Sequence, residues 1–310
     1  MNFSRQIIPS LILSLGASLS LVNLPARAFT VTQNNNPDVL LNALLSNEPN
    51  NYKGLSNFEV NLIGDSRAFG TFTDDPFGLG SAVAISTGNV TDLPGENTID
   101  SYGNELSTDL GLPFQKDDSI SMILSFDVDN TVDQLFFQYV FGSEEFLEYA
   151  GSDFNDSFSL SLNGLNYAQL SNEKQVSINN IAFSSSGPFS SDFIYNPVGT
   201  GPASSVTKLD GYTVPLLYNA DLVQGARNFL VINVKDEADD IYDSAVFLKA
   251  GTFGTVCPVG VNCDPSDTNN GNNGNNGNNG VKVPEADLSP LSLLVIVLTS
   301  IGLKKGKYMI

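Results

Sequence analysis

Short apolar segments with a two-residue period fill most of this chain of 310 residues, and they limit its fold more than any other feature. Glycine, asparagine, aspartate and proline separate the segments, as is typical of turns between short strands. The clearest segments are 119–126, 134–141, 157–162, 229–234 and 245–248. They predict an all-β fold, an antiparallel β-sandwich of jelly-roll type. Phenylalanines at strand positions are expected in its core: Phe136, Phe137, Phe141, Phe154 and Phe158.

Helical periodicity occurs once, over residues 37–45. Pro37 and Asp38 stand where a helix begins, and Pro49 follows shortly after its last apolar residue. We therefore expect one short N-terminal helix beside the sandwich.

Residues 1–28 have the order of a secretory signal peptide. A short basic segment ends at Arg5, an apolar run follows, and Ala26 and Ala28 form an A-x-A cleavage site. A membrane anchor is the alternative, but it needs about 20 apolar residues, and a proline and several serines interrupt this run. We expect cleavage before Phe29.

The chain after the signal peptide has three parts. The exported domain, residues 29–263, is followed by an asparagine- and glycine-rich linker over 264–282, which cannot build a core. Residues 288–303 are apolar and uncharged, and lysines follow them. A buried core helix is the alternative, but the linker separates this run from any domain it could pack into. We expect a stop-transfer helix that inserts transiently into the membrane.

A short motif lies between the linker and the apolar run: Val283, Pro284, Glu285 and Ala286. With the apolar helix and the basic end, the segment 283–310 resembles the PEP-CTERM sorting signal of bacterial exosortase systems. Ala286 stands where that family usually has a second proline. The resemblance implies an exported protein whose tail is recognised by an exosortase-type sorting enzyme and removed at the membrane. The expected destination is the cell surface or the extracellular matrix.

Composition excludes several functions. The chain has no histidine, so it can form no Ser-His-Asp triad, no Cys-His dyad and no histidine-ligated zinc site. It has 34 acidic and 14 basic residues and a net charge of −20. Nucleic acid is therefore not an expected partner, because its binding relies on lysine and arginine.

Cys257 and Cys263 are the only cysteines, and in an exported protein they predict a disulfide. A two-thiolate metal site is the alternative, and it lacks further cysteine or histidine ligands. The loop between the two cysteines is short, so closing it removes little entropy from the unfolded chain.

Five short motifs follow one another along the exported domain. They are 88–90 (Gly-Asn-Val), 137–146 (Phe-Gln-Tyr-Val-Phe-Gly-Ser-Glu-Glu-Phe), 154–158 (Phe-Asn-Asp-Ser-Phe), 177–180 (Ser-Ile-Asn-Asn) and 243–248 (Asp-Ser-Ala-Val-Phe-Leu). In this order they resemble the choice-of-anchor L domain, over nearly the whole stretch from Leu40 to Phe253. The resemblance implies an exported domain that occurs with interchangeable surface-sorting tails, PEP-CTERM among them. It implies no particular biochemical activity.

Carboxylates are dense in and after these motifs, and they predict a metal site. Packing several of them into strand-end loops costs repulsion unless a cation or water screens them, and Ca²⁺ accepts about six to eight oxygen ligands from flexible loops. We expect the loops to meet at one edge of the sandwich and to coordinate Ca²⁺ through Glu144 or Glu145 together with Asn155, Asp156, Asp240 and Asp243. A second candidate consists of Asp127, Asp129, Asn130 and Asp133. Solvated turns on an acidic surface are the alternative for both groups.

The expected function is non-enzymatic and adhesive or structural, in contact with exopolysaccharide or with other copies of the chain. Calcium would bridge acidic surfaces that otherwise repel each other. The alternative is a glycan-processing enzyme with two catalytic carboxylates, for which Glu145 and Asp156 are the candidates. Tyr149 and Tyr242, beside the acidic loops, are candidates for exposed aromatic contacts with polysaccharide.

Overall fold

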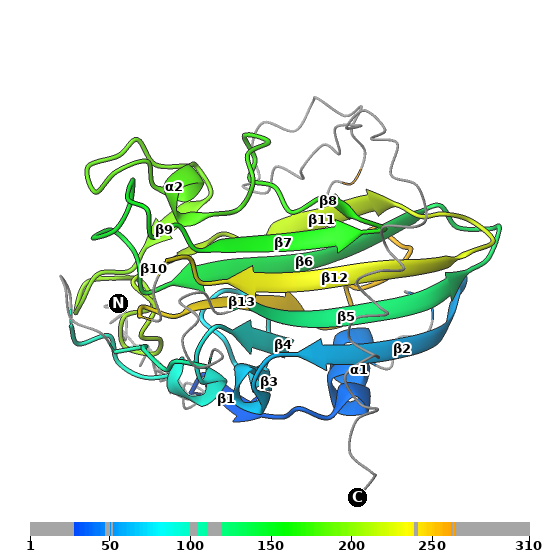
Figure 1. The fold of residues 1–310 in the computed structure, drawn as a ribbon, viewed down its shortest axis with the longest axis horizontal. Coiled ribbons are helices and arrows are strands. Elements are labelled where there is room, and N and C mark those ends of the chain that lie inside the picture. Colours follow the sequence, from blue (N-terminus) through cyan, green and yellow to red (C-terminus); the bar gives the residue numbers. More distant parts are fainter. Residues whose placement is uncertain are drawn as a thin grey trace, which may run out of the picture.

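Two antiparallel β-sheets face each other in the computed structural model, which describes residues 28–46, 50, 52–99, 105–110, 119–238, 241–261 and 263 (Figure 1). Within these residues the larger sheet has eight strands: β1 (Thr30–Gln33), β3 (Phe69–Thr73), β4 (Ser81–Ser86), β13 (Ser244–Lys249), β6 (Gln134–Ser143), β10 (Gly211–Thr213) and β9 (Phe193–Tyr195) in spatial order, with β11 (Leu216–Asp221) also paired to β6. The described part of the smaller sheet has five: β2 (Leu55–Ile63), β5 (Ser119–Val128), β12 (Arg227–Lys235), β7 (Ser157–Leu162) and β8 (Leu165–Asn166). The predicted antiparallel β-sandwich is confirmed.

Several predicted segments lie outside the described residues. They are the signal peptide up to Arg27, the linker 264–282, the sorting motif with Val283, Pro284, Glu285 and Ala286, the apolar run 288–303, and Asp240 of the expected calcium site. Among the residues that the structure does describe, no helix is long and apolar enough to cross a membrane. Signal cleavage, sorting and transient membrane insertion stay predictions.

Helix α1 (Pro37–Leu45) confirms the one helix expected from the sequence. The Asn36 side chain accepts a hydrogen bond from the backbone N–H of Asp38 at 2.9 Å, and Ser46 ends the helix in a left-handed conformation. The structure adds helix α2 (Ile178–Ile181) and two 3₁₀ turns, Ser66–Ala68 and Val90–Asp92. The expectation of a single helix is wrong in this respect, because elements of one turn are too short to show a helical period.

The strands of the two sheets differ in burial. β6 is buried at nearly every residue, whereas β12 and β7 alternate buried with half-exposed residues, so the smaller sheet has one solvent-facing side. Four of the five phenylalanines expected in the core are buried there: Phe136, Phe137, Phe141 and Phe158. The fifth, Phe154, is half-buried and packs edge-on against Tyr149.

One end of the sandwich collects the sequence motifs, and we call it the motif end. β6 ends there at Ser143, β7 begins there at Ser157, and β13 begins there at Ser244. Helix α2 lies at the same end, on the left of Figure 1. Elsewhere, Cys257 and Cys263 form the predicted disulfide.

Candidate functional site

Three contacts hold the motif end together. β13 pairs with β6 at Ser244 and Ser143, which joins the last motif to the Gly-Ser-Glu-Glu motif. The Ser244 hydroxyl donates to Asp156 Oδ2 at 2.6 Å, and Ser157 forms a β-bridge with Ser177. Motifs that are distant in sequence are thus neighbours in space.

Glu144 follows β6 and is buried, with only 2% of its surface exposed. Its carboxylate accepts the backbone N–H groups of Glu105 and Leu106, the latter at 2.7 Å. Burial raises the pKa of Glu144 to about 7, although the two N–H donors and Lys208 act in the opposite direction. The side chain ties the segment 105–110 to the end of β6, and it gains or loses a proton near neutral pH.

Asp156 is fully buried immediately before β7. Besides the Ser244 hydroxyl, it accepts the backbone N–H of Glu237 at 3.0 Å through Oδ1. A buried carboxyl group is stable only where its oxygens have such partners. Asp156 therefore joins the start of β7, the start of β13 and the segment after β12.

Asp243 precedes β13 and explains a motif glycine. Its Oδ2 accepts the backbone N–H of Thr108 at 3.2 Å, and its own backbone bonds to Leu106 and Glu144. A Cβ atom on Gly88 would lie 1.7 Å from this Oδ2, far inside van der Waals contact. Glycine at position 88 leaves room for the carboxylate, so the first and last motifs depend on each other.

The structure brings the described members of the expected calcium set to the motif end: Glu144, Glu145, Asn155, Asp156 and Asp243. Glu145 is fully buried, and Asn155 Oδ1 accepts the backbone N–H of Asn179 at 2.9 Å. In the described part of the chain, no group of three or more histidine, cysteine, aspartate or glutamate residues is arranged to hold a metal ion. Calcium binding stays a prediction.

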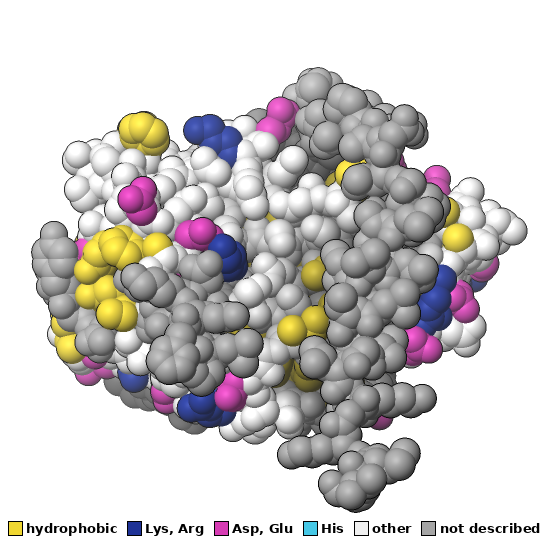
Figure 2. Space-filling model, in the orientation of Figure 1, with side chains coloured by type: hydrophobic (Ala, Val, Ile, Leu, Met, Phe, Trp, Pro, Cys, Tyr) yellow, Lys and Arg dark blue, Asp and Glu magenta, His cyan; other side chains and the backbone are white. Residues whose placement is uncertain are grey.

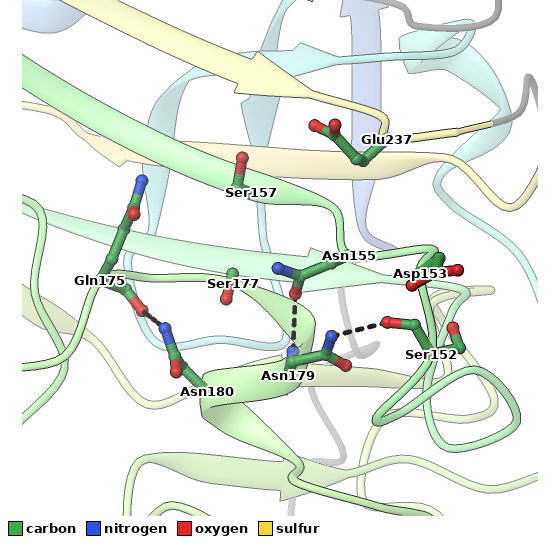
Figure 3. Close-up of a pocket in the computed structure, with 9 residues that line it drawn as sticks. All are labelled: Ser152, Asp153, Asn155, Ser157, Gln175, Ser177, Asn179, Asn180 and Glu237. Carbon is green, nitrogen blue, oxygen red and sulfur yellow. Dashed lines mark hydrogen bonds between the residues drawn. The ribbon is translucent and has the colours of Figure 1, made fainter.

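A polar pocket opens at the motif end, between the turn before β7 and helix α2 (Figure 3). Its volume is about 470 Å³, and nine residues line it: Ser152, Asp153, Asn155, Ser157, Gln175, Ser177, Asn179, Asn180 and Glu237. The 177–180 motif was not expected from the sequence to bind a ligand. The available signal was the density of serine and asparagine in two motifs, 154–158 and 177–180, that meet in space.

The model of the choice-of-anchor L domain matches residues 30–254, a stretch that contains all five motifs. The chain belongs to the choice-of-anchor L family. No curated protein and no solved structure matches it. Choice-of-anchor domains are generally non-enzymatic and surface-associated, so this choice-of-anchor L protein is an exported protein of the cell surface.

The second calcium candidate of this choice-of-anchor L protein lies at the far end of the sandwich, around the turn between β5 and β6: Asp127, Asp129, Asn130 and Asp133. Asp127 accepts hydrogen bonds from Asn57 at 2.7 Å and Arg227 at 3.0 Å, which lower its pKa. Asp129 accepts the Thr131 hydroxyl and backbone N–H, and these bonds lower its pKa too. Existing donors therefore stabilise both carboxylates in their charged form.

The expectation of exposed tyrosines at the motif end is wrong. Tyr242 is buried and Tyr149 is half-buried, and their hydroxyl groups lie 3.2 Å apart. Burial and the Tyr149 hydroxyl raise the pKa of Tyr242 well above its usual value. In this choice-of-anchor L protein the two rings pack against each other instead of facing solvent.

Proposed function

We propose that this choice-of-anchor L protein is a non-enzymatic adhesive or structural component of the cell surface or extracellular matrix. It contacts exopolysaccharide or other surface proteins, including copies of itself. The observation that carries the proposal is how the motif end uses its carboxylates. Glu144, Asp156 and Asp243 accept hydrogen bonds from distant segments of the backbone, so these acids hold the loops of the sandwich together.

The same burial argues against glycan hydrolysis. Glu145 and Asp156, the candidate catalytic pair, are both 0% exposed. The two carboxyl groups of a glycosidase flank the scissile bond and must contact the substrate. Fully buried side chains cannot do this, so the geometry favours a structural role for both residues.

We assign delivery to the C-terminal segment. An exosortase-type enzyme recognises Val283, Pro284, Glu285 and Ala286 while the apolar run 288–303 is inserted in the membrane, and it removes the tail there. Membership in a family of exported surface domains supports this assignment. Deletion of 283–310 should then release the protein into the medium, where fractionation of cells and medium detects it.

Calcium stabilisation is part of the proposal. Buried acids gather at the motif end of a chain whose net charge is −20, and a divalent cation would relieve their repulsion. Asp240 lies three residues before Asp243 in the sequence and would complete the set. Thermal unfolding of the full chain in mild detergent, first in EDTA and then in a millimolar calcium series, tests this part.

The expected result is a melting temperature that rises with calcium concentration. At a hundred times the Kd, calcium should add about 2.7 kcal/mol to the free energy of unfolding. Asp243→Asn should abolish the rise, measured against the same variant in EDTA. Asp133→Asn, at the far end, should retain it. A flat response across the series would remove calcium from the proposal and leave the surface function standing.

A panel of polysaccharides tests the absence of catalysis. The full chain should cleave none of them. Hydrolysis that disappears in Glu145→Gln would overturn the non-enzymatic proposal, because it would give a buried carboxylate a chemical role.

A further inference from the structure

The pocket beside α2 is of the size that small-molecule sites commonly have, and all nine residues that line it are polar. They are serines, side-chain amides and the two acids Asp153 and Glu237. Most protein pockets are largely apolar with a few polar groups, so a lining of this kind suits a ligand that is itself covered with hydrogen-bonding groups.

Hydrogen bonds within the wall fix its shape before any ligand arrives. Asn179 donates its backbone N–H to Asn155 Oδ1 at 2.9 Å and its side-chain amide to the Ser152 carbonyl at 2.8 Å. Asn180 donates its side-chain amide to the Gln175 carbonyl at 3.0 Å. Figure 3 shows these bonds along one side of the pocket, with Asn155 between α2 and β7. A preformed wall saves the ordering cost of binding.

The buried carboxylate of Asp156 holds the opposite wall of the pocket. Asp156 accepts the backbone N–H of Glu237, so the structural carboxylate of the motif end positions a pocket residue. The Glu237 carboxylate pairs with Lys235, which offsets its charge. The pocket therefore adjoins the end of β12, the central strand of the smaller sheet.

The chemistry of the lining selects the ligand. Amides and hydroxyls both donate and accept hydrogen bonds, as the hydroxyl groups of a sugar do. No lysine or arginine lines the pocket, whereas Asp153 and Glu237 do, so the lining offers no counter-charge to a uronate or a sulfated sugar. A neutral, hydroxyl-rich ligand fits best.

Two exposed phenylalanines follow helix α2, whose residues Asn179 and Asn180 line the pocket. Phe183 is 65% exposed and Phe189 is 47% exposed, and both follow α2. A Cβ atom on Gly151 would lie 2.6 Å from the Phe183 carbonyl oxygen, so this loop packs against the turn that leads into Ser152. Figure 2 shows a hydrophobic side chain projecting from the loops beside α2. Exposed apolar groups that lie together and are surrounded by polar residues mark interaction surfaces. An aromatic ring can pack on the C–H face of a sugar.

We propose that this pocket binds a neutral polysaccharide, with one sugar unit between Asn155, Ser157 and Gln175 and the neighbouring units along Phe183 and Phe189. The proposal rests on the proposed surface function and names the ligand class for its glycan contact.

Affinity electrophoresis of the full chain in mild detergent tests the proposal, with xyloglucan, galactomannan and a mixed-linkage β-glucan as neutral probes and alginate as the anionic probe. Ser157→Ile places a branched side chain in the pocket at a strand position that accepts it. Ser159→Ile is the matched control, because it makes the same change on the same solvent-facing side of β7, outside the pocket. Gln175→Ala removes a pocket amide without adding bulk. The melting temperature of each variant establishes that it is folded.

Retardation by at least one neutral probe is expected. Ser157→Ile should weaken it at least about tenfold, and Ser159→Ile should leave it unchanged. Gln175→Ala and Phe183→Ala should each cause a smaller loss, about threefold. Equal losses of affinity in Ser157→Ile and Ser159→Ile would overturn the proposal that the pocket binds polysaccharide. Tighter binding of alginate, or no retardation by any neutral probe, would overturn it too. Surface fractionation of the same variants tests the proposed function separately. If the protein stays at the cell surface but the pocket binds no polysaccharide, only the ligand proposal is wrong.

Discussion

Acidic side chains gather at both ends of the sandwich, and the two groups differ in where their hydrogen-bond partners come from. At the motif end, Asp156 accepts from residues 81 and 88 positions away, and Glu144 accepts from residues 38 and 39 positions away. At the far end, Asp129 accepts from Thr131, two positions away. Asp127 has distant partners in Asn57 and Arg227, but all three side chains are at least partly exposed.

The difference separates acids that fix tertiary structure from acids that shape a turn. Removing the distant partners of a buried carboxylate lowers the free energy of unfolding strongly, because neither water nor a neighbouring group can replace the lost hydrogen bonds. An exposed carboxylate in a turn exchanges its partners for water at little cost. Replacing acids at the two ends should therefore have very unequal effects on stability.

The largest effect is expected for Asp156→Ala. The buried Ser244 hydroxyl and the Glu237 N–H both lose their acceptor, and the free energy of unfolding should fall by about 4 kcal/mol. Urea denaturation of the full chain measures it. Asp153→Ala, an exposed acid in the same turn, is the matched control and should change stability by no more than about 0.5 kcal/mol. Similar losses in both variants would mean that burial does not distinguish these acids.

The next effect is a dependence of stability on pH. The pKa of Glu144 is about 7 in the folded chain and 4.5 in the unfolded one, so between these values the folded state binds the extra proton. The free energy of unfolding should fall as pH rises through this window, by about 3 kcal/mol in total. Denaturation in EDTA between pH 5 and pH 8 measures the slope. Glu144→Gln, which cannot titrate, should flatten it, and an unchanged slope in that variant would assign the dependence to another group.

A smaller loss is expected for Gly88→Ala. The new Cβ displaces the Asp243 carboxylate from its bond to Thr108, at a cost of about 2 kcal/mol. The double variant Gly88→Ala, Asp243→Ala should lose less than the sum of the two single variants, because the clash disappears with the carboxylate. Strict additivity would show that the two residues do not interact.

The fold was predictable where side chains alternate over a long strand. β5, β12 and β7 have one buried and one solvent-facing side, which gives the two-residue period a clear form. β9 and β10 are strands of three residues each, and α2 has a single turn, so neither kind of element is long enough to show a period. β10 is positioned by pairing with β6 and β9 by pairing with β10, whereas α2 is positioned by packing at the motif end.

The meeting of the acidic motifs was also predictable, because they follow the end of β6 and precede the starts of β7 and β13, which lie at one end of the sandwich. Their burial was not. An acid in a strand-end loop is usually exposed. Nothing in the sequence indicates that Glu144 accepts the N–H groups of Glu105 and Leu106. The bond from the Thr108 N–H to Asp243 has no signal in the sequence either. The pocket was missed for a related reason, since its walls come from two motifs that are close only in the folded chain.

The smallest effect is expected at the far end. Asp129→Ala removes two bonds from Thr131 that lie within an exposed turn, and the melting temperature should move by no more than about 2 °C. Its pKa is lowered from 3.8, so the charged form stabilises the fold above that value and this contribution is lost only as pH falls below it. The variant should therefore keep the full pH 5 to pH 8 slope that Glu144 causes. Asp129→Ala could instead lose as much stability as Asp156→Ala, or alter that pH slope. Either result would show that the acids at the two ends do not differ because of burial or because their partners are distant in sequence.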